Sequence, residues 1–78
     1  IIACILKHAK DVSRKTRLIY GCNLSLSQFN KYALCVIDCG LLSKNQLEGI
    51  EFYETTDKGL IFLEDYVRIS KVLQQMHL

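Results

Sequence analysis

A chain of 78 residues is near the lower end of what one hydrophobic core can stabilise, which excludes an independent second domain and favours dimerisation. Half of the residues are apolar and none is proline, so the composition excludes a disordered chain and is typical of a helix-rich one. The net charge of +2 is unevenly distributed. Residues 1–45 carry seven Lys and Arg against two Asp, whereas residues 46–78 carry three Lys and Arg against six Asp and Glu. An anionic partner is therefore expected for the first half only.

Two helices are predicted at the start of the chain. Residues 1–9 place apolar side chains at helical spacing, which predicts a first helix. Ser13 is expected to be the N-cap of a short second helix over residues 14–20. Gly21 and Asn23 then supply the turn that ends this helix.

The third predicted helix has signals at both ends. Ser25 and Gln28 fit the reciprocal capping pattern in which a hydroxyl and an amide satisfy two backbone donors. Gly40 stands where a left-handed C-terminal cap is expected. Between these ends the apolar side chains recur at helical spacing and predict the buried face, namely Leu26, Phe29, Ala33, Val36 and Ile37.

After Gly40 the apolar period changes from helical to alternating. Residues 41–47 predict one strand and residues 50–55 a second, joined by a turn at Glu48 and Gly49. In the second strand, Phe52 is expected on one face and Tyr53 on the other. The pattern therefore predicts a β-hairpin.

The last predicted helix begins at Asp57, with Thr56 as its cap, and runs nearly to the end of the chain. A helix of about 20 residues is roughly 30 Å long, so part of it must project past the core or lie against another chain. Its apolar stripe is therefore expected to form a dimer interface, with packing against the first helix as the alternative. The stripe consists of Leu63, Tyr66, Val67, Ser70, Leu73 and Met76.

Several short motifs follow one another along almost the whole chain: KTRLIY at 15–20, NLS at 23–25, KY at 31–32, GLL at 40–42 and YETTDKG at 53–59. In wording and order they resemble the small archaeal winged helix-turn-helix transcriptional regulators, whose pattern is K-T-x-I-x-Y, N-L-S, K-Y, G-L-[IL] and Y-x-x-T-x-K-G. The resemblance implies DNA binding and a homodimer formed through the C-terminal helix. Because the chain ends soon after Met76, a compact pairing of the last helices is expected rather than a long coiled coil.

The expected fold class is mainly α with a small β-hairpin (α+β). The order helix, helix, helix, hairpin, helix is that of a winged helix-turn-helix, with the second and third helices as the helix-turn-helix and the hairpin as the wing. Residues 1–56 are expected to form this domain, and residues 57–78 a C-terminal dimerisation helix packed on it.

A basic cluster at the start of the second helix is the first candidate for DNA contact. Three cations and one hydroxyl in four positions are suited to phosphates; they are Arg14, Lys15, Thr16 and Arg17. The K-T step of the resemblance falls within this cluster. The alternative is a basic patch that only makes the chain soluble.

The polar face of the third helix is the second candidate, because a helix fits the major groove and its polar side chains reach base edges. Gln28 and Asn30 are suited to adenine, and Lys31 to guanine or a phosphate. The complete set is Ser25, Ser27, Gln28, Asn30 and Lys31, with Lys44 added from the tip of the wing. The alternative is an ordinary solvated helix face.

We expect a soluble, cytoplasmic protein without a membrane partner, because no apolar run suits a bilayer and no signal pattern opens the chain. Its four cysteines are then expected to be reduced, buried hydrophobic groups; they are Cys4, Cys22, Cys35 and Cys39. The alternative is zinc held between two pairs spaced i, i+4, Cys4 with His8 and Cys35 with Cys39. No metal or other cofactor is expected.

The predicted function is sequence-dependent or architectural binding of double-stranded DNA by a homodimeric transcriptional regulator. A winged-helix module that binds other proteins and not DNA is the alternative, since this architecture serves both purposes. No nucleophile motif or phosphate loop is present, so enzyme activity is not expected.

Overall fold

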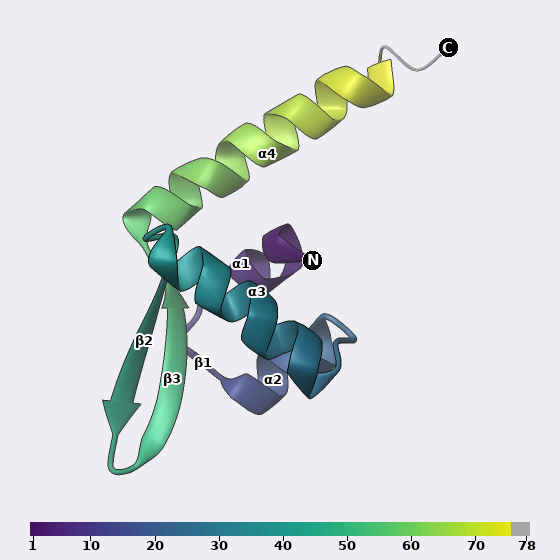
Figure 1. The fold of residues 1–78 in the computed structure, drawn as a ribbon. Coiled ribbons are helices and arrows are strands. Elements are labelled where there is room, and N and C mark those ends of the chain that lie inside the picture. Colours follow the sequence, from purple (N-terminus) through teal and green to yellow (C-terminus); the bar gives the residue numbers. More distant parts are fainter. Residues whose placement is uncertain (76–78) are drawn as a thin grey trace.

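The computed structural model describes residues 1–75 and has the predicted class, mainly α with a β-hairpin (Figure 1). The elements are α1 (Ile2–His8), β1 (Ser13–Arg14), α2 (Lys15–Gly21), α3 (Leu26–Asp38), β2 (Leu42–Leu47), β3 (Ile50–Thr55) and α4 (Asp57–Gln75). The hairpin and α4 extend in different directions from the three shorter helices (Figure 1). Among residues 1–75, the structure contains no helix with the length and hydrophobicity of a membrane-spanning segment.

The core lies where the helices α1, α2 and α3, the sheet and the start of α4 meet. Helical spacing directs Ile5 and Leu6 of α1 inward, and both are fully buried. Phe29 of α3 meets Tyr53 of β3 edge to face, with ring centroids 5.4 Å apart. The predicted buried face of α3 is confirmed at Phe29, Ala33 and Val36, whereas Leu26, the first residue of the helix, is 57% exposed.

The predicted hairpin is confirmed. Strands β2 and β3 pair antiparallel from Leu42 opposite Thr55 to Leu47 opposite Ile50. Glu48 and Gly49 make the turn with φ values of 51° and 79°, the positive values that a two-residue hairpin turn of type I′ requires. Tyr53 of β3 is buried in the core.

A third strand, β1, was not predicted. Ser13 pairs with Tyr53 and Arg14 with Phe52, which places β3 at the centre of a sheet with the order β1-β3-β2. The predicted N-cap role of Ser13 is wrong, because α2 begins only at Lys15 and has no side-chain cap. The buried Ser13 hydroxyl instead donates to the backbone carbonyl of Asp11 at 2.8 Å, and the carbonyl of His8 at the end of α1 is 3.2 Å away.

The other predicted caps are confirmed. Ser25 and Gln28 form the complete capping box at the start of α3. Gly40 follows α3 with a φ of 78°, a conformation that favours glycine. Thr56 caps α4, because its hydroxyl accepts the Gly59 N–H at 3.0 Å and donates to the Gly40 carbonyl at 2.6 Å. The last contact ties the start of α4 to the end of α3.

The expectation that all four cysteines are reduced and buried is corrected by the structure. Cys4 of α1 and Cys22, the C-cap of α2, form a disulfide, with Cα atoms 5.8 Å apart. Cys35 and Cys39 are free thiols, as expected, but both are exposed. The pair that bonds is separated by 18 residues and meets only because α1 packs beside the end of α2.

Candidate nucleic-acid interface

The outer face of α3 is polar at its start and apolar further along. Ser27, Asn30, Lys31 and Leu34 follow one another at helical spacing, and all are exposed. They lie opposite the buried side chains of the same helix. With 13 residues α3 is about 20 Å long, and its free face has the dimensions of an element that enters the major groove.

Two of the predicted base-reading residues have a structural task. The Gln28 side-chain oxygen accepts the Ser25 N–H at 3.0 Å, and the Ser25 hydroxyl accepts the Gln28 N–H at 3.1 Å. Bidentate reading of adenine needs both the oxygen and the nitrogen of an amide side chain. Gln28 therefore retains only its amino group for a base while the cap is intact, whereas Asn30 retains both groups.

The basic cluster follows directly from strand β1. Pairing of Arg14 with Phe52 fixes the backbone where α2 begins. Arg14, Thr16 and Arg17 are exposed, whereas Lys15 is half-buried with its Nζ 5.9 Å from the centre of the Phe29 ring. A shallow hollow joins this cluster to the turn of the wing and is lined by Arg14, Lys15, Thr16, Gly49, Ile50 and Glu51.

A second hollow lies between α3 and the hairpin. Three of the predicted DNA-binding residues contribute to its lining, namely Lys15, Asn30 and Lys44. Lys15 lines both hollows. The fold therefore brings Lys15 of the basic cluster, Asn30 of α3 and Lys44 of the wing to one side of the domain.

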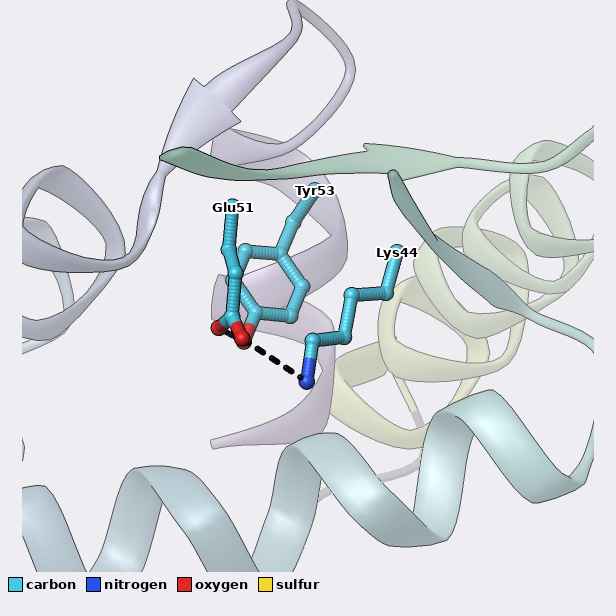
Figure 2. Close-up of polar contacts among 3 residues, drawn as sticks. All are labelled: Lys44, Glu51 and Tyr53. Carbon is cyan, nitrogen blue, oxygen red and sulfur yellow. Dashed lines mark hydrogen bonds and ion pairs between the residues drawn. The ribbon is translucent and has the colours of Figure 1, made fainter. Parts of the chain in front are cut away.

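Lys44 does not lie at the wing tip, as predicted from the sequence, but within β2. It sits opposite Tyr53 on the inner face of the hairpin. Its Nζ is 3.3 Å from a carboxylate oxygen of Glu51, and Figure 2 shows Lys44, Glu51 and Tyr53 on the same side of the sheet. Both charged side chains are more than a third exposed, so the ion pair is worth at most about 1 kcal/mol and can exchange for another partner.

Glu51 also accepts a hydrogen bond from the Tyr53 hydroxyl at 3.4 Å. Burial raises the pKa of Tyr53, and the negative charge and hydrogen bond of Glu51 raise it further. Tyr53 is therefore neutral near pH 7 and acts as a hydrogen-bond donor. Glu51 thus places one negative charge within the otherwise basic surface.

Leu34 was missed as a candidate. It is 62% exposed and lies seven residues after Ser27, on the same face of α3. An apolar side chain in the major groove can contact the methyl group of thymine. The signal was its helical spacing from the polar candidates.

The residues of the predicted dimer stripe on α4 differ in their exposure. Leu63 is buried in the core of its own chain, which corrects its place in the stripe, whereas Tyr66, Val67 and Leu73 are 43–62% exposed. Ser70 is half-buried, and Met76 lies outside the described residues. Further exposed apolar side chains follow on the same helix: Leu60, Ile61, Phe62, Ile69 and Val72.

An apolar hollow continues this surface onto the domain. It is formed where α1, α3 and α4 approach one another and is lined by Ile1, Ile2, Ala3, Tyr32, Phe62 and Tyr66. The Phe62 and Tyr66 rings stack with their planes 19° apart. The exposed apolar surface of α4 thus extends past the helix itself.

Comparison with known proteins agrees with this architecture. A family model described as winged helix-turn-helix matches residues 1–74. The crystal structure of Sso10a-2, a DNA-binding protein from Sulfolobus solfataricus, is similar to this chain with a TM-score of 0.80 and 24% sequence identity. The similarity covers 96% of this chain and 82% of that one. No curated protein sequence matches the chain.

Proposed function

The chain belongs to the winged helix-turn-helix family, and from this premise we propose that it binds double-stranded DNA as a homodimer and acts as a transcriptional regulator or an architectural protein. The family and its fold are non-enzymatic. The similar Sulfolobus structure is that of a DNA-binding protein, which supports the proposal. We also propose that the protein is cytoplasmic, because the chromosome of an archaeal cell lies in the cytoplasm.

One observation carries the DNA-binding part: Lys15, Asn30 and Lys44, from three different elements, line one hollow beside the exposed face of α3. We assign base contacts to Ser27, Asn30 and Lys31, with Ser25 and Gln28 mainly holding the start of the helix. The basic cluster of residues 14–17 contacts the phosphates on one side, and Lys44 contacts them from the wing.

The homodimer is proposed from the exposed surface of α4. A monomer rarely leaves a large contiguous apolar surface in water. Tyr66, Val67, Ser70 and Leu73 remain as interface residues, and Met76 continues their spacing beyond the described residues. Residues 1–56 are then the DNA-binding unit, and residues 57–78 pair two such units.

The decisive experiment is a salt-dependent DNA-binding titration of a triple variant, Arg14→Ala, Lys15→Ala and Arg17→Ala. Each lost phosphate contact should reduce the slope of log affinity against log salt by about 0.9, or about 2.7 for three. The loss of affinity should be alike for all duplex sequences, because phosphates carry no sequence information.

The matched control removes the same charge from exposed positions elsewhere, by Lys7→Ala, Lys10→Ala and Arg68→Ala. Its salt slope should stay that of the wild type. Equal losses in both variants would show a general charge effect and contradict the assigned surface. If the wild type does not bind random duplex at micromolar concentration in low salt, the protein-binding module is the better account.

A further inference from the structure

The disulfide between Cys4 and Cys22 has a third potential metal ligand beside it. His8, one turn after Cys4 on α1, has its Nδ1 3.6 Å from the Cys4 sulfur and 3.7 Å from the Cys22 sulfur. In the described part of the chain, the potential ligand atoms of Cys4, His8 and Cys22 all lie within 4.8 Å of one another. The zinc site considered from the sequence is corrected accordingly: Cys22 joins Cys4 and His8, and Cys35 and Cys39 take no part.

The distances suit a tetrahedral zinc ion. With Zn–S bonds of about 2.3 Å and Zn–N bonds of about 2.0–2.1 Å, a sulfur and a nitrogen ligand of one ion are about 3.6 Å apart. Both sulfur–nitrogen separations in the structure are within about 0.1 Å of this value. Only the two sulfurs are too close together, because they are bonded to each other.

The imidazole is held in place by its surroundings. In the disulfide form its Nδ1 donates to the Cys4 carbonyl at 2.9 Å, a hydrogen bond that a metal bound at Nδ1 would replace, and its other edge packs against Gly21 in either form. A Cβ on Gly21 would lie 2.7 Å from the His8 Cδ2 atom, so glycine leaves the space that the ring occupies. All three ligand residues are half-buried, which shields the site but leaves a path for an ion.

We propose that, in the reduced chain, Cys4, His8 and Cys22 bind one Zn²⁺ ion, with the fourth position open to water or another small ligand. A dithiol reductant supplies two electrons and two protons, the disulfide becomes two thiols, and the reductant leaves as its own disulfide. Zn²⁺ then displaces the two thiol protons and binds neutral His8 through Nδ1, while the ring proton moves to Nε2.

The ion and the disulfide are thus alternative uses of the same two sulfurs. Either one connects α1 to the residue that ends α2, at the turn of the helix-turn-helix. The site shares no residue with the lining of the hollow between α3 and the hairpin, so the inference does not depend on DNA binding.

The test is an anaerobic titration of the reduced, metal-free chain with Co²⁺ as a spectroscopic probe, followed by displacement with Zn²⁺. One equivalent per chain should bind with the absorption of tetrahedral, thiolate-bound cobalt. X-ray absorption of the zinc form should show two sulfurs at about 2.3 Å and a nitrogen at about 2.0 Å. The oxidised chain, which has the same sequence, should not bind either ion at this site.

Variants identify the ligands. Loss of an outer-shell partner can weaken metal binding by up to roughly 100-fold. Loss of a direct ligand should weaken it by more, which is the result expected for Cys4→Ser, Cys22→Ser and His8→Ala. The matched control, Cys35→Ser with Cys39→Ser, removes two thiols and should bind as the wild type does. Circular dichroism checks that each variant is folded.

Three results would overturn the proposal. The first is a reduced wild-type chain that binds no cobalt or zinc at micromolar concentration. The second is binding that persists in the oxidised chain, and the third is binding that is lost in the Cys35→Ser, Cys39→Ser control. All three are independent of whether any variant at the site folds.

Discussion

Gly59 allows α4 to pass close to the backbone before the hairpin. A Cβ at this position would collide with the Leu41 carbonyl oxygen and approach the Thr55 side chain. The Leu41 carbonyl also accepts the Thr56 N–H at 3.0 Å, so it cannot move without loss of a hydrogen bond. Glycine in a helix normally costs about 1 kcal/mol relative to alanine, and here the close contact requires it.

Gly59→Ala should therefore lower the free energy of unfolding by about 1–3 kcal/mol, the usual cost of overpacking, in spite of alanine's better helix propensity. Urea unfolding at one fixed protein concentration measures it, since the stability of a dimer depends on concentration. Gln74→Ala, at an exposed position of the same helix, should stay within about 0.5 kcal/mol of the wild type. A more stable Gly59→Ala variant would show that the contact relaxes.

At the scale of elements, the capping box gives Ser25 a structural role that the nearby Ser27 does not have. Ser25 accepts the Gln28 N–H, whereas Ser27 is exposed on the outer face of α3. Ser25→Ala should lower the free energy of unfolding by about 1 kcal/mol, the typical value of an N-cap, and Ser27→Ala should leave it within about 0.5 kcal/mol. Thermal and urea unfolding of the two variants test this. Equal stability of both would contradict the structural role of Ser25.

The wing carries a carboxylate that competes with DNA for Lys44. Glu51→Gln removes this negative charge and frees the Lys44 ammonium, so DNA affinity at low salt should rise and the salt slope should grow by about 0.9. Glu54→Gln is the matched control, because Glu54 follows Tyr53 in β3 and so points to the opposite face of the sheet. A rise in affinity of the same size in both variants would indicate net charge as the cause and leave Lys44 without a specific contact.

The elements that were predicted correctly are those with local signals. The hairpin carries alternating side chains and a two-residue turn, and α3 has a cap at each end, so both follow from neighbouring residues. Strand β1 does not, because two residues show no periodicity and Ser13 is paired with Tyr53, 40 positions along the chain. Ser13 also has the chemistry of an N-cap, which explains the wrong assignment.

In the candidate site, too, features with local signals could be predicted and features that depend on tertiary packing could not. The basic cluster and the polar face of α3 could be predicted from composition and helical spacing. The ion pair of Lys44 with Glu51 could not, since it depends on which face of the hairpin packs against α3. The disulfide of Cys4 with Cys22 depends likewise on the packing of α1 beside the end of α2, which the chain's spacing does not reveal.

The shape of the whole molecule sets the requirement for a partner. The molecule measures 50 × 25 × 20 Å, and its long dimension reflects α4, which runs away from the other helices (Figure 1). Only Gly59 and Leu63 of this helix are buried, and both lie in its first two turns. Most of α4 therefore lacks the tertiary packing from which helices in proteins draw most of their stability. A second α4 that covers this surface would supply it.

Charge on the exposed face of α4 should therefore prevent pairing without harming the domain. Val67→Asp with Leu73→Glu places two carboxylates where an apolar partner is proposed, at positions outside the monomer's core. Sedimentation equilibrium at tens of micromolar should give the mass of a dimer for the wild type and of a monomer for the variant. Asn45→Asp with Gln46→Glu, on the exposed wing, adds the same charge and should remain dimeric. A monomeric wild type at this concentration would mean that α4 serves another partner.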